Sequence, residues 1–413
     1  MKKYTIKTYG CKLNQSETDN LETVLSQNFK KVDIEKADLV VLNSCGVIDK
    51  TERKVLKEAK KRKREGKRVI VTGCLPSMTK KAKEVADLVL EGNDPKEFSK
   101  KISKLYNVKE IEDSRLPALQ KEGSASIIIP IATGCMGNCS YCSAKLARGE
   151  LNSFSMNEIE RRVKKALKSG IKEIQLTSQD LGIYGLDKGK PLLKDLVQNL
   201  IKIEDNYRIK LGMMNPGFID DYIEGFLSLF KSDKLYNFLH LPVQSGDNSI
   251  LQRMNRRHSV EDFVKIVDLI RSRYNNFLIS TDIIVGFPGE GEEEFQKTID
   301  LIKKTRPHII NITRYSEREG TVAADLDDMP SKIKKERSRK LTEIGKRIRL
   351  ADNEQMVGKE FKALIFREGK DETKLARIFN GKAVVLEDGD VGSFQDVKIT
   401  DFKHNYLIGD VQS

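Results

Sequence analysis

Strand-like and helix-like segments alternate along most of this chain of 413 residues. Near the N-terminus, three short segments rich in Val, Ile and Thr lie at 5–10, 37–44 and 67–73. Helical patterns separate them, such as 16–29, with Leu21, Leu25 and Phe29 on one face. Alternating βα units are typical of a parallel, doubly wound sheet. We therefore predict an N-terminal α/β domain over 1–110.

The same alternation continues after a charged and polar stretch, Ser99–Gly123, which we interpret as a linker. Six predicted strands follow, at 126–132, 173–178, 209–214, 237–243, 277–286 and 308–315. Helical patterns separate them at 156–169, 191–204, 218–231, 260–273 and 291–305. Six such repeats indicate a full or partial barrel, with an active site at the carboxyl ends of its strands.

The last part of the chain changes character. Residues 331–350 have the apolar spacing of one long helix, and 351–413 consist of short strands separated by glycines. The fold class is therefore α/β: an N-terminal doubly wound parallel sheet, a central partial (β/α)6 barrel over 121–350, and a small all-β barrel over 351–413.

Secretion and membrane spanning are not expected. The opening MKKYTIKTYG is too polar for a signal peptide, and no apolar run approaches the roughly 18 residues of a membrane helix. We therefore expect a cytoplasmic protein with no membrane partner. The formal charge of +13 suggests nucleic acid or an anionic membrane surface as a partner, although a merely basic, soluble surface explains it equally well.

Three of the six cysteines form a compact motif. Cys135, Cys139 and Cys142 have the spacing C-x3-C-x2-C and follow the first predicted barrel strand. Zinc normally takes four protein ligands, whereas a [4Fe–4S] cluster held by three thiolates leaves one iron free to bind a small molecule. Free or zinc-binding cysteines are the alternative interpretation.

The other three cysteines share a structural position rather than a spacing. Cys11, Cys45 and Cys74 each follow a predicted strand of the N-terminal sheet. Because the carboxyl ends of parallel strands lie on one edge, we expect the three thiols to converge there and hold a second cluster. Three buried structural cysteines are the alternative.

The C-x3-C-x2-C motif, with Tyr141 just before its third cysteine, resembles that of the radical S-adenosylmethionine (SAM) superfamily. The resemblance implies that the open iron binds SAM and cleaves it to a 5′-deoxyadenosyl radical. Three polar strand-end residues, Ser178, Gln179 and Asp180, lie where such enzymes commonly hold the SAM amino group. A helix-capping role for Asp180 is the alternative.

Other residues are weaker candidates for contacts with a ligand at the carboxyl ends of the barrel strands. Gln244, Ser245 and Asp282 lie at or near strand ends and are predicted SAM or substrate contacts. His240 fits a satisfied core or rim histidine better than a ligand.

Ordered motifs along the whole chain resemble those of the methylthiotransferases. These are YGCKLNQSE (9–17), NSC (43–45), GCLPS (73–77), TSQDLGIYG (177–185), LHLPVQSG (239–246), STDIIVGFPGE (280–290) and REGTVAA (318–324). The C-terminal module resembles the TRAM domain, an RNA-binding barrel. GMMNP (212–216) is similar to the archaeal–eukaryotic branch, although Gly46 occupies a position that is often Thr there.

That branch methylthiolates N6-threonylcarbamoyladenosine beside the anticodon, so the resemblance implies a transferase that acts on the tRNA anticodon loop. It also implies two [4Fe–4S] clusters: Cys135, Cys139 and Cys142 generate the radical, and Cys11, Cys45 and Cys74 carry the sulfur. An electron donor and a sulfur source are required but not identified, and we expect a monomer. Two alternatives are methylthiolation of a ribosomal-protein aspartate and an RNA-binding iron–sulfur protein without catalysis.

The positive charge is concentrated in two segments. Residues 51–70 and 331–350 each have a balance of +7, whereas 351–413 have a balance of −3. Each basic segment is either a solvated helix face or a source of salt-dependent phosphate contacts. We predict that tRNA contacts come from these two segments rather than from a uniformly basic C-terminal barrel.

Overall fold

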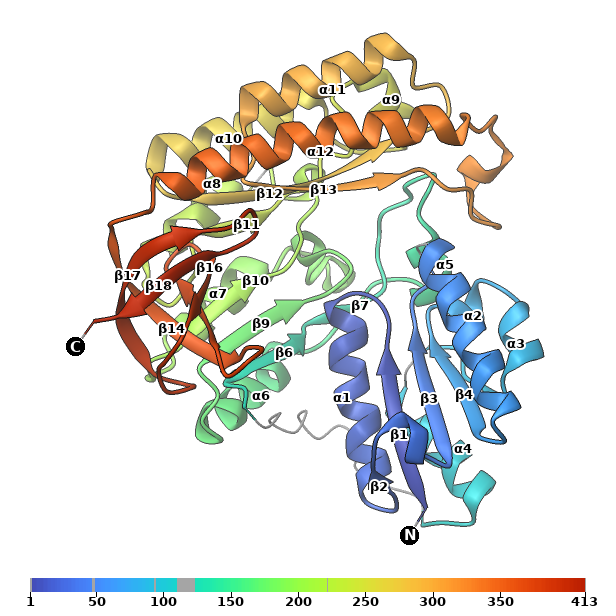
Figure 1. Cartoon of the computed structure of the whole chain (residues 1–413). Coiled ribbons are helices and arrows are strands. Elements are labelled where there is room, and N and C mark those ends of the chain that lie inside the picture. The colour runs from blue at the N-terminus through green and yellow to red at the C-terminus, as the bar shows by residue number, and fades with distance from the viewer. Residues whose placement is uncertain (1, 47–48, 93, 110–122, 221, 413) are drawn as a thin grey trace.

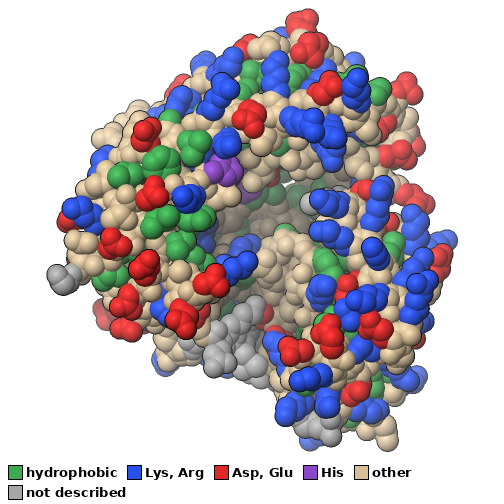
Figure 2. Space-filling model, in the orientation of Figure 1, with side chains coloured by type: hydrophobic (Ala, Val, Ile, Leu, Met, Phe, Trp, Pro, Cys, Tyr) green, Lys and Arg blue, Asp and Glu red, His purple; other side chains and the backbone are tan. Residues whose placement is uncertain are grey.

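The computed structural model describes residues 2–46, 49–92, 94–109, 123–220 and 222–412. Three bodies follow one another along the chain, and Figure 1 shows that the N-terminal body lies beside the central one while the C-terminal body covers its far end. Figure 2 shows a hollow between them, with Lys and Arg side chains along its walls.

The N-terminal body is a five-stranded parallel sheet in the order β2-β1-β3-β4-β5. Its strands are β1 (Lys3–Thr8), β2 (Lys30–Lys31), β3 (Leu39–Ser44), β4 (Arg68–Gly73) and β5 (Leu88–Val89). Helices α1 (Lys12–Ser26) and α4 (Pro95–Tyr106) cover one face, and α2 (Asp49–Arg64) and α3 (Lys81–Val85) cover the other. All six residues of β3 are buried, as expected for a central strand covered on both faces. The predicted doubly wound sheet is confirmed.

Two boundaries in this body differ from the prediction. The first helix begins directly after Cys11 rather than at residue 16, and Phe29 lies beyond its end but still packs against Tyr4. The predicted linker Ser99–Gly123 is wrong over 99–106, because α4 extends to Tyr106 and buries Phe98 and Ile102 in the core. The charged side chains on its other face give this helix a composition typical of a linker. Of the remaining predicted linker, 110–122 lies outside the described residues.

The central body contains six parallel strands. They are β6 (Ser126–Pro130), β9 (Glu173–Thr177), β10 (Arg208–Leu211), β11 (Phe238–His240), β12 (Leu278–Val285) and β13 (Ile309–Arg314). They form two three-stranded sheets, and isolated parallel bridges between Ile209 and Leu235 and between Met213 and His240 join β10 to β11. The sheet therefore curves through all six strands with β6 and β13 at its edges, which confirms the partial (β/α)6 barrel.

Helices pack on the outer face of this sheet. They include α6 (Met156–Lys168), α7 (Leu193–Ile201), α10 (Val260–Arg273) and α11 (Glu292–Thr305), close to the predicted ranges. The predicted helix 218–231 is wrong as a single element. Three short pieces replace it: η5 (Pro216–Phe218), α8 (Ile223–Leu227) and η6 (Ser228–Lys231).

Helix α12 (Ser331–Glu354) packs along the barrel and leads to the C-terminal body. Leu341 and Ile348 are buried in the core of the barrel, while Ile333 is exposed. Five strands then form a closed barrel in the order β14-β15-β16-β18-β17. Their bounds are β14 (Glu360–Glu368), β15 (Lys374–Ile378), β16 (Ala383–Leu386), β17 (Phe394–Phe402) and β18 (Leu407–Val411). The predicted small all-β barrel is confirmed.

A buried ion pair joins the C-terminal barrel to the central body. Arg377 Nε of β15 lies 2.7 Å from Glu173 Oε1 at the start of β9, and the Glu173 side chain is fully buried. The carboxylate also accepts hydrogen bonds from Ser126, Gln175 and Tyr236. These partners, chiefly the charge of Arg377, outweigh burial and hold the pKa of Glu173 below its usual value.

We expect Arg377→Met to lower the stability of the assembled protein by about 3–5 kcal/mol, because it leaves the buried Glu173 carboxylate without its cation. Thermal unfolding of the full chain measures the effect. The control is Lys398→Met, which changes an exposed lysine of β17. Adding Glu173→Gln to the variant should recover part of the loss. Equal melting temperatures for Arg377→Met and the wild type would refute this role.

Candidate active site

The loop that carries Cys135, Cys139 and Cys142 lies between β7 (Ala132–Thr133) and α5 (Ser143–Arg148). Its tight course depends on Gly134, which has φ +72°, because a Cβ there would lie 1.9 Å from the Glu150 carbonyl oxygen. Cys142 is the N-cap residue of α5, and Gly137 N donates to Cys135 Sγ at 3.2 Å. The loop therefore folds back on its own cysteines and leaves all three thiols partly buried.

Burial favours the neutral form of the thiols in this loop, so their ionisation depends on nearby positive charge. Burial raises the pKa of Cys135 to about 11, with only the Gly137 N–H opposing it, and burial also raises the pKa of Cys142. Arg256 Nη1 donates to Cys139 Sγ at 3.4 Å, so one positive charge already faces the set. Thiolates bind metal and their formation is favoured by nearby positive charge, so three buried thiols this close suit an iron-containing group.

Cys11, Cys45 and Cys74 lie at the carboxyl edge of the N-terminal sheet. Cys45 directly follows β3, Cys74 follows β4, and Cys11 is the N-cap residue of α1. Gly10 has φ +123°, and a Cβ there would lie 2.8 Å from Cys45 Cβ, so the turn before Cys11 presses against Cys45. Burial raises the pKa of Cys74 to about 11, and the charge of Cys45 adds to this effect.

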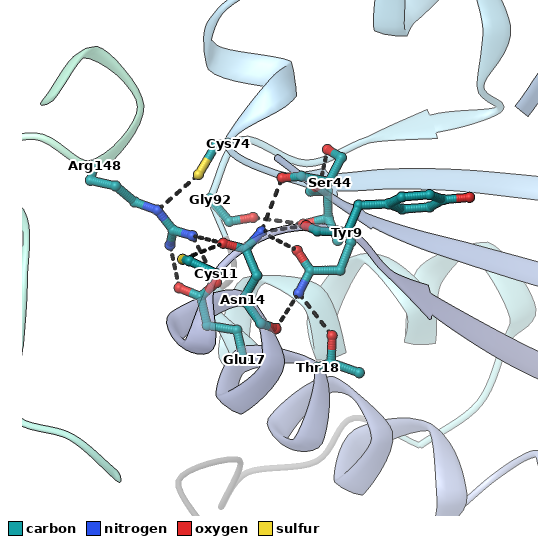
Figure 3. A network of polar contacts seen from close by, with 11 residues as sticks. Tyr9, Cys11, Asn14, Glu17, Thr18, Ser44, Cys74, Gly92 and Arg148 are labelled. Atoms are coloured by element: carbon teal, nitrogen blue, oxygen red, sulfur yellow. Dashed lines mark hydrogen bonds and ion pairs between the residues drawn. The ribbon is translucent and has the colours of Figure 1, made fainter. Parts of the chain in front are cut away.

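Asn14 fixes the position of Cys11 relative to the sheet. Its side-chain amide donates to Asn43 Oδ1 at 3.2 Å and to the Ser44 carbonyl oxygen at 3.1 Å, which ties the first turn of α1 to the end of β3. Its Oδ1 accepts from Cys11 Sγ at 3.3 Å (Figure 3). The hydrogen bonds of one asparagine therefore hold Cys11 beside the end of β3.

Arg148 connects the two cysteine sets. It lies at the end of α5, six residues after Cys142, and crosses to the edge of the N-terminal sheet (Figure 3). Its Nε donates to Cys74 Sγ at 3.2 Å, and its Nη2 donates to Asn14 Oδ1 at 3.2 Å. Its guanidinium also forms a two-pronged ion pair with Glu17 of α1. Side chains from both bodies thus meet at one guanidinium, which comes from the helix that directly follows Cys142.

A second ion pair joins the same two bodies. Arg318 Nη1, from the segment after β13, lies 2.8 Å from Glu52 Oε2 of α2, and both side chains are mostly buried. In addition, Ser16 Oγ of α1 donates to the Ile128 carbonyl oxygen of the edge strand β6, at 3.2 Å. Together with the pairs of Arg148 and Arg318, this hydrogen bond fixes the N-terminal body against the open side of the barrel.

The end of β9 carries unsatisfied polar atoms next to Asp180, which lies close enough to Cys135 to raise its pKa beyond the effect of burial. Ser178 Oγ and Gln179 Oε1 are buried, and neither has a hydrogen-bond partner among the described residues. Buried polar atoms without partners are costly unless a ligand or water completes them. This strand end therefore fits the predicted role in holding SAM, and that role stays a prediction.

Asp180 has a clear structural role. Its Oδ1 accepts from Gly182 N at 2.9 Å and from Asn215 N at 3.1 Å, so it caps η3 (Leu181–Ile183) and orders the neighbouring loop. Burial raises the pKa of Asp180 to about 6. The capping alternative is thus what the structure shows, and a SAM contact through Asp180 stays a prediction.

The weaker candidates are placed as follows. Gln244 adopts φ +74° where the chain leaves the barrel, and its backbone pairs with β12, while Ser245 Oγ accepts from Asp247 N. Asp282 Oδ1 pairs with His240 Nε2 at 2.7 Å and accepts from Asn311 at 2.8 Å. His240 is therefore a satisfied rim histidine. Tyr141 packs edge-on against Phe287.

Sequence reasoning missed Arg148 and Arg256, the two cations beside the cysteines. Arg256 is held by Asn215 Oδ1 at 2.9 Å and by the Pro242 carbonyl oxygen at 2.8 Å. Neither arginine lies in a recognisable motif. For Arg148, the short distance along the chain from Cys142 is the only sequence signal.

Among the described residues, no group of three His, Cys, Asp or Glu side chains is arranged to hold a single metal ion. A cluster differs from an ion in this respect, because each cysteine binds a different iron and the thiolates need not meet at one point.

Comparisons with known proteins agree with this geometry. Residues 129–302 match the model of the radical SAM superfamily, residues 3–90 that of the uncharacterized protein family UPF0004, and residues 354–412 that of the TRAM domain. A probable threonylcarbamoyladenosine tRNA methylthiotransferase of Archaeoglobus fulgidus is 46% identical, and the match covers 98% of this chain and 97% of the relative. A similarly named Pyrococcus horikoshii protein is 38% identical over the full length of both chains.

Solved structures show the same fold at low identity. The radical SAM methyltransferase TsrM from Kitasatospora setae superposes with a TM-score of 0.57 at 14% identity, covering 78% of this chain and 75% of that one. The cobalamin-dependent radical enzyme OxsB gives a TM-score of 0.52 at 14% identity, covering 84% of this chain and 56% of that one.

We expect Arg148→Met to lower stability by on the order of 3 kcal/mol, because Glu17 and Cys74 lose a buried cationic partner. We also expect it to lower the iron retained at the N-terminal cysteine set after anaerobic reconstitution. Thermal unfolding and iron content per chain measure the two effects. The matched control is Arg161→Met, an exposed arginine of α6. Unchanged melting temperature and iron content would show that Arg148 does not join the two bodies.

Proposed function

Because the chain belongs to the threonylcarbamoyladenosine tRNA methylthiotransferases, a family of radical SAM enzymes, we propose that it methylthiolates C2 of N6-threonylcarbamoyladenosine at position 37 of tRNA. The full-length match to the Archaeoglobus fulgidus protein carries this proposal. The contact of Arg148, from the helix after Cys142, with Cys74 supports it, since insertion of sulfur requires a radical source and a sulfur donor at one carbon. No observation favours the ribosomal-protein or non-catalytic alternatives.

In this proposal, Cys135, Cys139 and Cys142 hold a [4Fe–4S] cluster. With SAM bound, such a cluster supplies a 5′-deoxyadenosyl radical, which can abstract a hydrogen from an aromatic carbon. Ser178 and Gln179 are positioned to contact SAM because their side chains lack partners. Asp180 orders that loop, and Arg256 offsets the negative charge of the Cys139 thiolate. Tyr141, Gln244, Ser245 and Asp282 complete the proposed set of contacts.

A second cluster, on Cys11, Cys45 and Cys74, would carry the sulfur. Arg148 donates a hydrogen bond to Cys74, and Asn14 accepts one from Cys11. Residues of both bodies therefore surround the proposed second cluster. The count of two clusters is part of this proposal.

The proposed domains are a methylthiotransferase N-terminal domain over 1–110, a radical SAM core over 121–350 and a TRAM domain over 351–413. The proposed partner is the anticodon loop of tRNA, with an electron donor and a sulfur source still to be identified. We also propose a monomeric cytoplasmic enzyme. No helix among the described residues is long and apolar enough to cross a bilayer.

The structure changes the expected contribution of the two basic segments. On α12, Lys334 pairs with Asp328 and Arg337 pairs with Glu290, and both basic side chains are buried. On α2, Arg62 is buried against Glu58. These cations stabilise the fold, so the proposed phosphate contacts are left to the exposed residues of the same helices, such as Lys57 and Lys346.

Nucleoside analysis of tRNA tests the function. In a knockout complemented with this chain, liquid chromatography–mass spectrometry of digested tRNA should detect the 2-methylthio derivative of N6-threonylcarbamoyladenosine. The Cys139→Ala variant serves as the inactive control. Absence of the methylthio nucleoside in the wild-type complement would refute the proposal.

The division of labour between the cysteine sets predicts two further results. Anaerobic reconstitution should give about eight irons per chain if both sets hold [4Fe–4S] clusters, and a value near four would contradict this. Cys139→Ala should abolish formation of 5′-deoxyadenosine from SAM and dithionite. Cys45→Ala should retain it while methylthio transfer is lost. Equal loss of SAM cleavage in both variants would mean that the roles are not separate.

A further inference from the structure

The inner wall of the partial barrel is unusually polar. Alternate residues of its strands, such as Ile174, Leu176, Ile209 and Leu211, pack outward into the apolar core under the helices. The residues between them therefore face inward, since side chains alternate along a strand. This inner set contains Glu173, Gln175, Lys210, His240, Asp282 and Asn311. A binding chamber rather than a packed interior is the expected consequence.

Most of these inner groups already have partners within the barrel. Glu173 is paired with Arg377 and accepts three further hydrogen bonds at the end covered by the C-terminal barrel. Towards the mouth, Asp282 pairs with His240 and accepts from Asn311. Both acidic groups of the chamber are therefore engaged.

Lys210 differs from all of them. Its Nζ lies 4.6 Å from the centre of the Phe238 ring, on the next strand, and makes no hydrogen bond or ion pair with any residue the structure describes. The side chain lies deep in the molecule yet keeps accessible surface, which means that it faces the hollow of the barrel. Burial, with the charge of Arg377 next, lowers the pKa of Lys210 to about 7.

The charges around Lys210 leave a positive excess. The nearest carboxylate, Glu173, is already offset by Arg377, so Lys210 remains as a surplus cation. Lys12 of α1, directly after Cys11, is also close enough to disfavour the charged form of Lys210. The Lys210 ammonium thus lies within electrostatic reach of the open side of the barrel, where the sulfur-carrying cysteines are proposed. An anion bound there would relieve the repulsion.

We propose that Lys210 binds the carboxylate of the threonylcarbamoyl substituent and so selects the modified adenosine over adenosine. This inference rests on the proposed function. The carboxylate is the one anionic group that the substituent adds to the base, and a charge-assisted hydrogen bond to a buried ammonium is among the stronger polar contacts. Backbone phosphates fit the site poorly, because they remain outside when a single base enters the barrel.

The chemistry of the base agrees with this placement. The N6 substituent and C2 of adenine point in different directions from the ring. An anchor for the substituent deep in the barrel therefore leaves C2 free to face the mouth, where Arg148, from the helix after Cys142, contacts Cys74. Lys210 acts in this scheme as a specificity-determining residue with no part in bond making.

The test compares the binding of two anticodon stem-loops, one with N6-threonylcarbamoyladenosine and one with adenosine at position 37, to the reconstituted full chain without SAM. The wild type should bind the modified RNA at least about tenfold more tightly. Lys210→Met should abolish this preference without changing the affinity for unmodified RNA. Lys210→Arg should retain part of it. Lys164→Met, an exposed lysine of α6, is the matched control and should behave as the wild type.

A third RNA isolates the carboxylate. If the substituent carries a methyl ester in place of the carboxylate, the wild type should lose its preference, whereas Lys210→Met should bind the ester and the acid equally. Melting temperature and SAM-dependent formation of 5′-deoxyadenosine should be unchanged in Lys210→Met, which excludes misfolding and damage to the radical site.

Three outcomes would overturn the inference. If Lys210→Met keeps the preference, the carboxylate binds elsewhere. If it weakens both RNAs equally, Lys210 contacts a phosphate. If it instead weakens SAM binding, the anion held is the SAM carboxylate. Failure of the proposed function is a separate result, because the wild type would then make no methylthio nucleoside on modified tRNA.

Discussion

The buried ion pair between Arg148 and Glu17 is the contact on which the arrangement of the candidate site depends. Arg148 comes from the helix that follows Cys142, and Glu17 comes from the helix that follows Cys11. The same guanidinium donates to Cys74 and Asn14. The nearly buried pair of Arg148 and Glu17 therefore connects the helix that begins after Cys142 to the helix that begins after Cys11. A surface ion pair would be weak and screened, whereas loss of one partner of a buried pair is strongly destabilising.

Buried ion pairs also hold other parts of the molecule together. Arg377 and Glu173 fix the C-terminal barrel to the central strands, Arg318 and Glu52 join α2 to the segment after β13, and Arg337 and Glu290 hold α12. Several of the basic residues are thus structural. The formal charge of +13 is unchanged by these pairs, because each removes one positive and one negative charge from the surface. Lys210 differs from these arginines, because it lies deep in the molecule and forms no ion pair with a described residue.

Much of the fold could be predicted from local patterns. The apolar strands of both sheets, and helices such as α10 and α11, lie close to the ranges predicted from the spacing of apolar residues. This spacing differs between strands and amphipathic helices and is recognisable within a few residues. The errors have physical causes. α4 carries many lysines on its exposed face, a composition that predicts a linker, although Phe98 and Ile102 anchor it in the core. The segment 218–231 has enough apolar residues for one helix, but it breaks into short turns that fit the end of the barrel.

The sequence by itself determined the two sets of three cysteines. One set is recognised because each cysteine follows a strand, and the other by its spacing in a single loop, and both signals are local properties of the chain. Only the tertiary structure decided that Arg148 reaches Cys74, 74 positions away along the chain, and that Asp180 caps a turn. It also decided that Lys210 forms no hydrogen bond or ion pair with a described residue, whereas Glu173, on the preceding strand β9, has four polar partners. Pairing of buried charges depends on which distant side chains meet when the three bodies pack, and no local pattern records that choice.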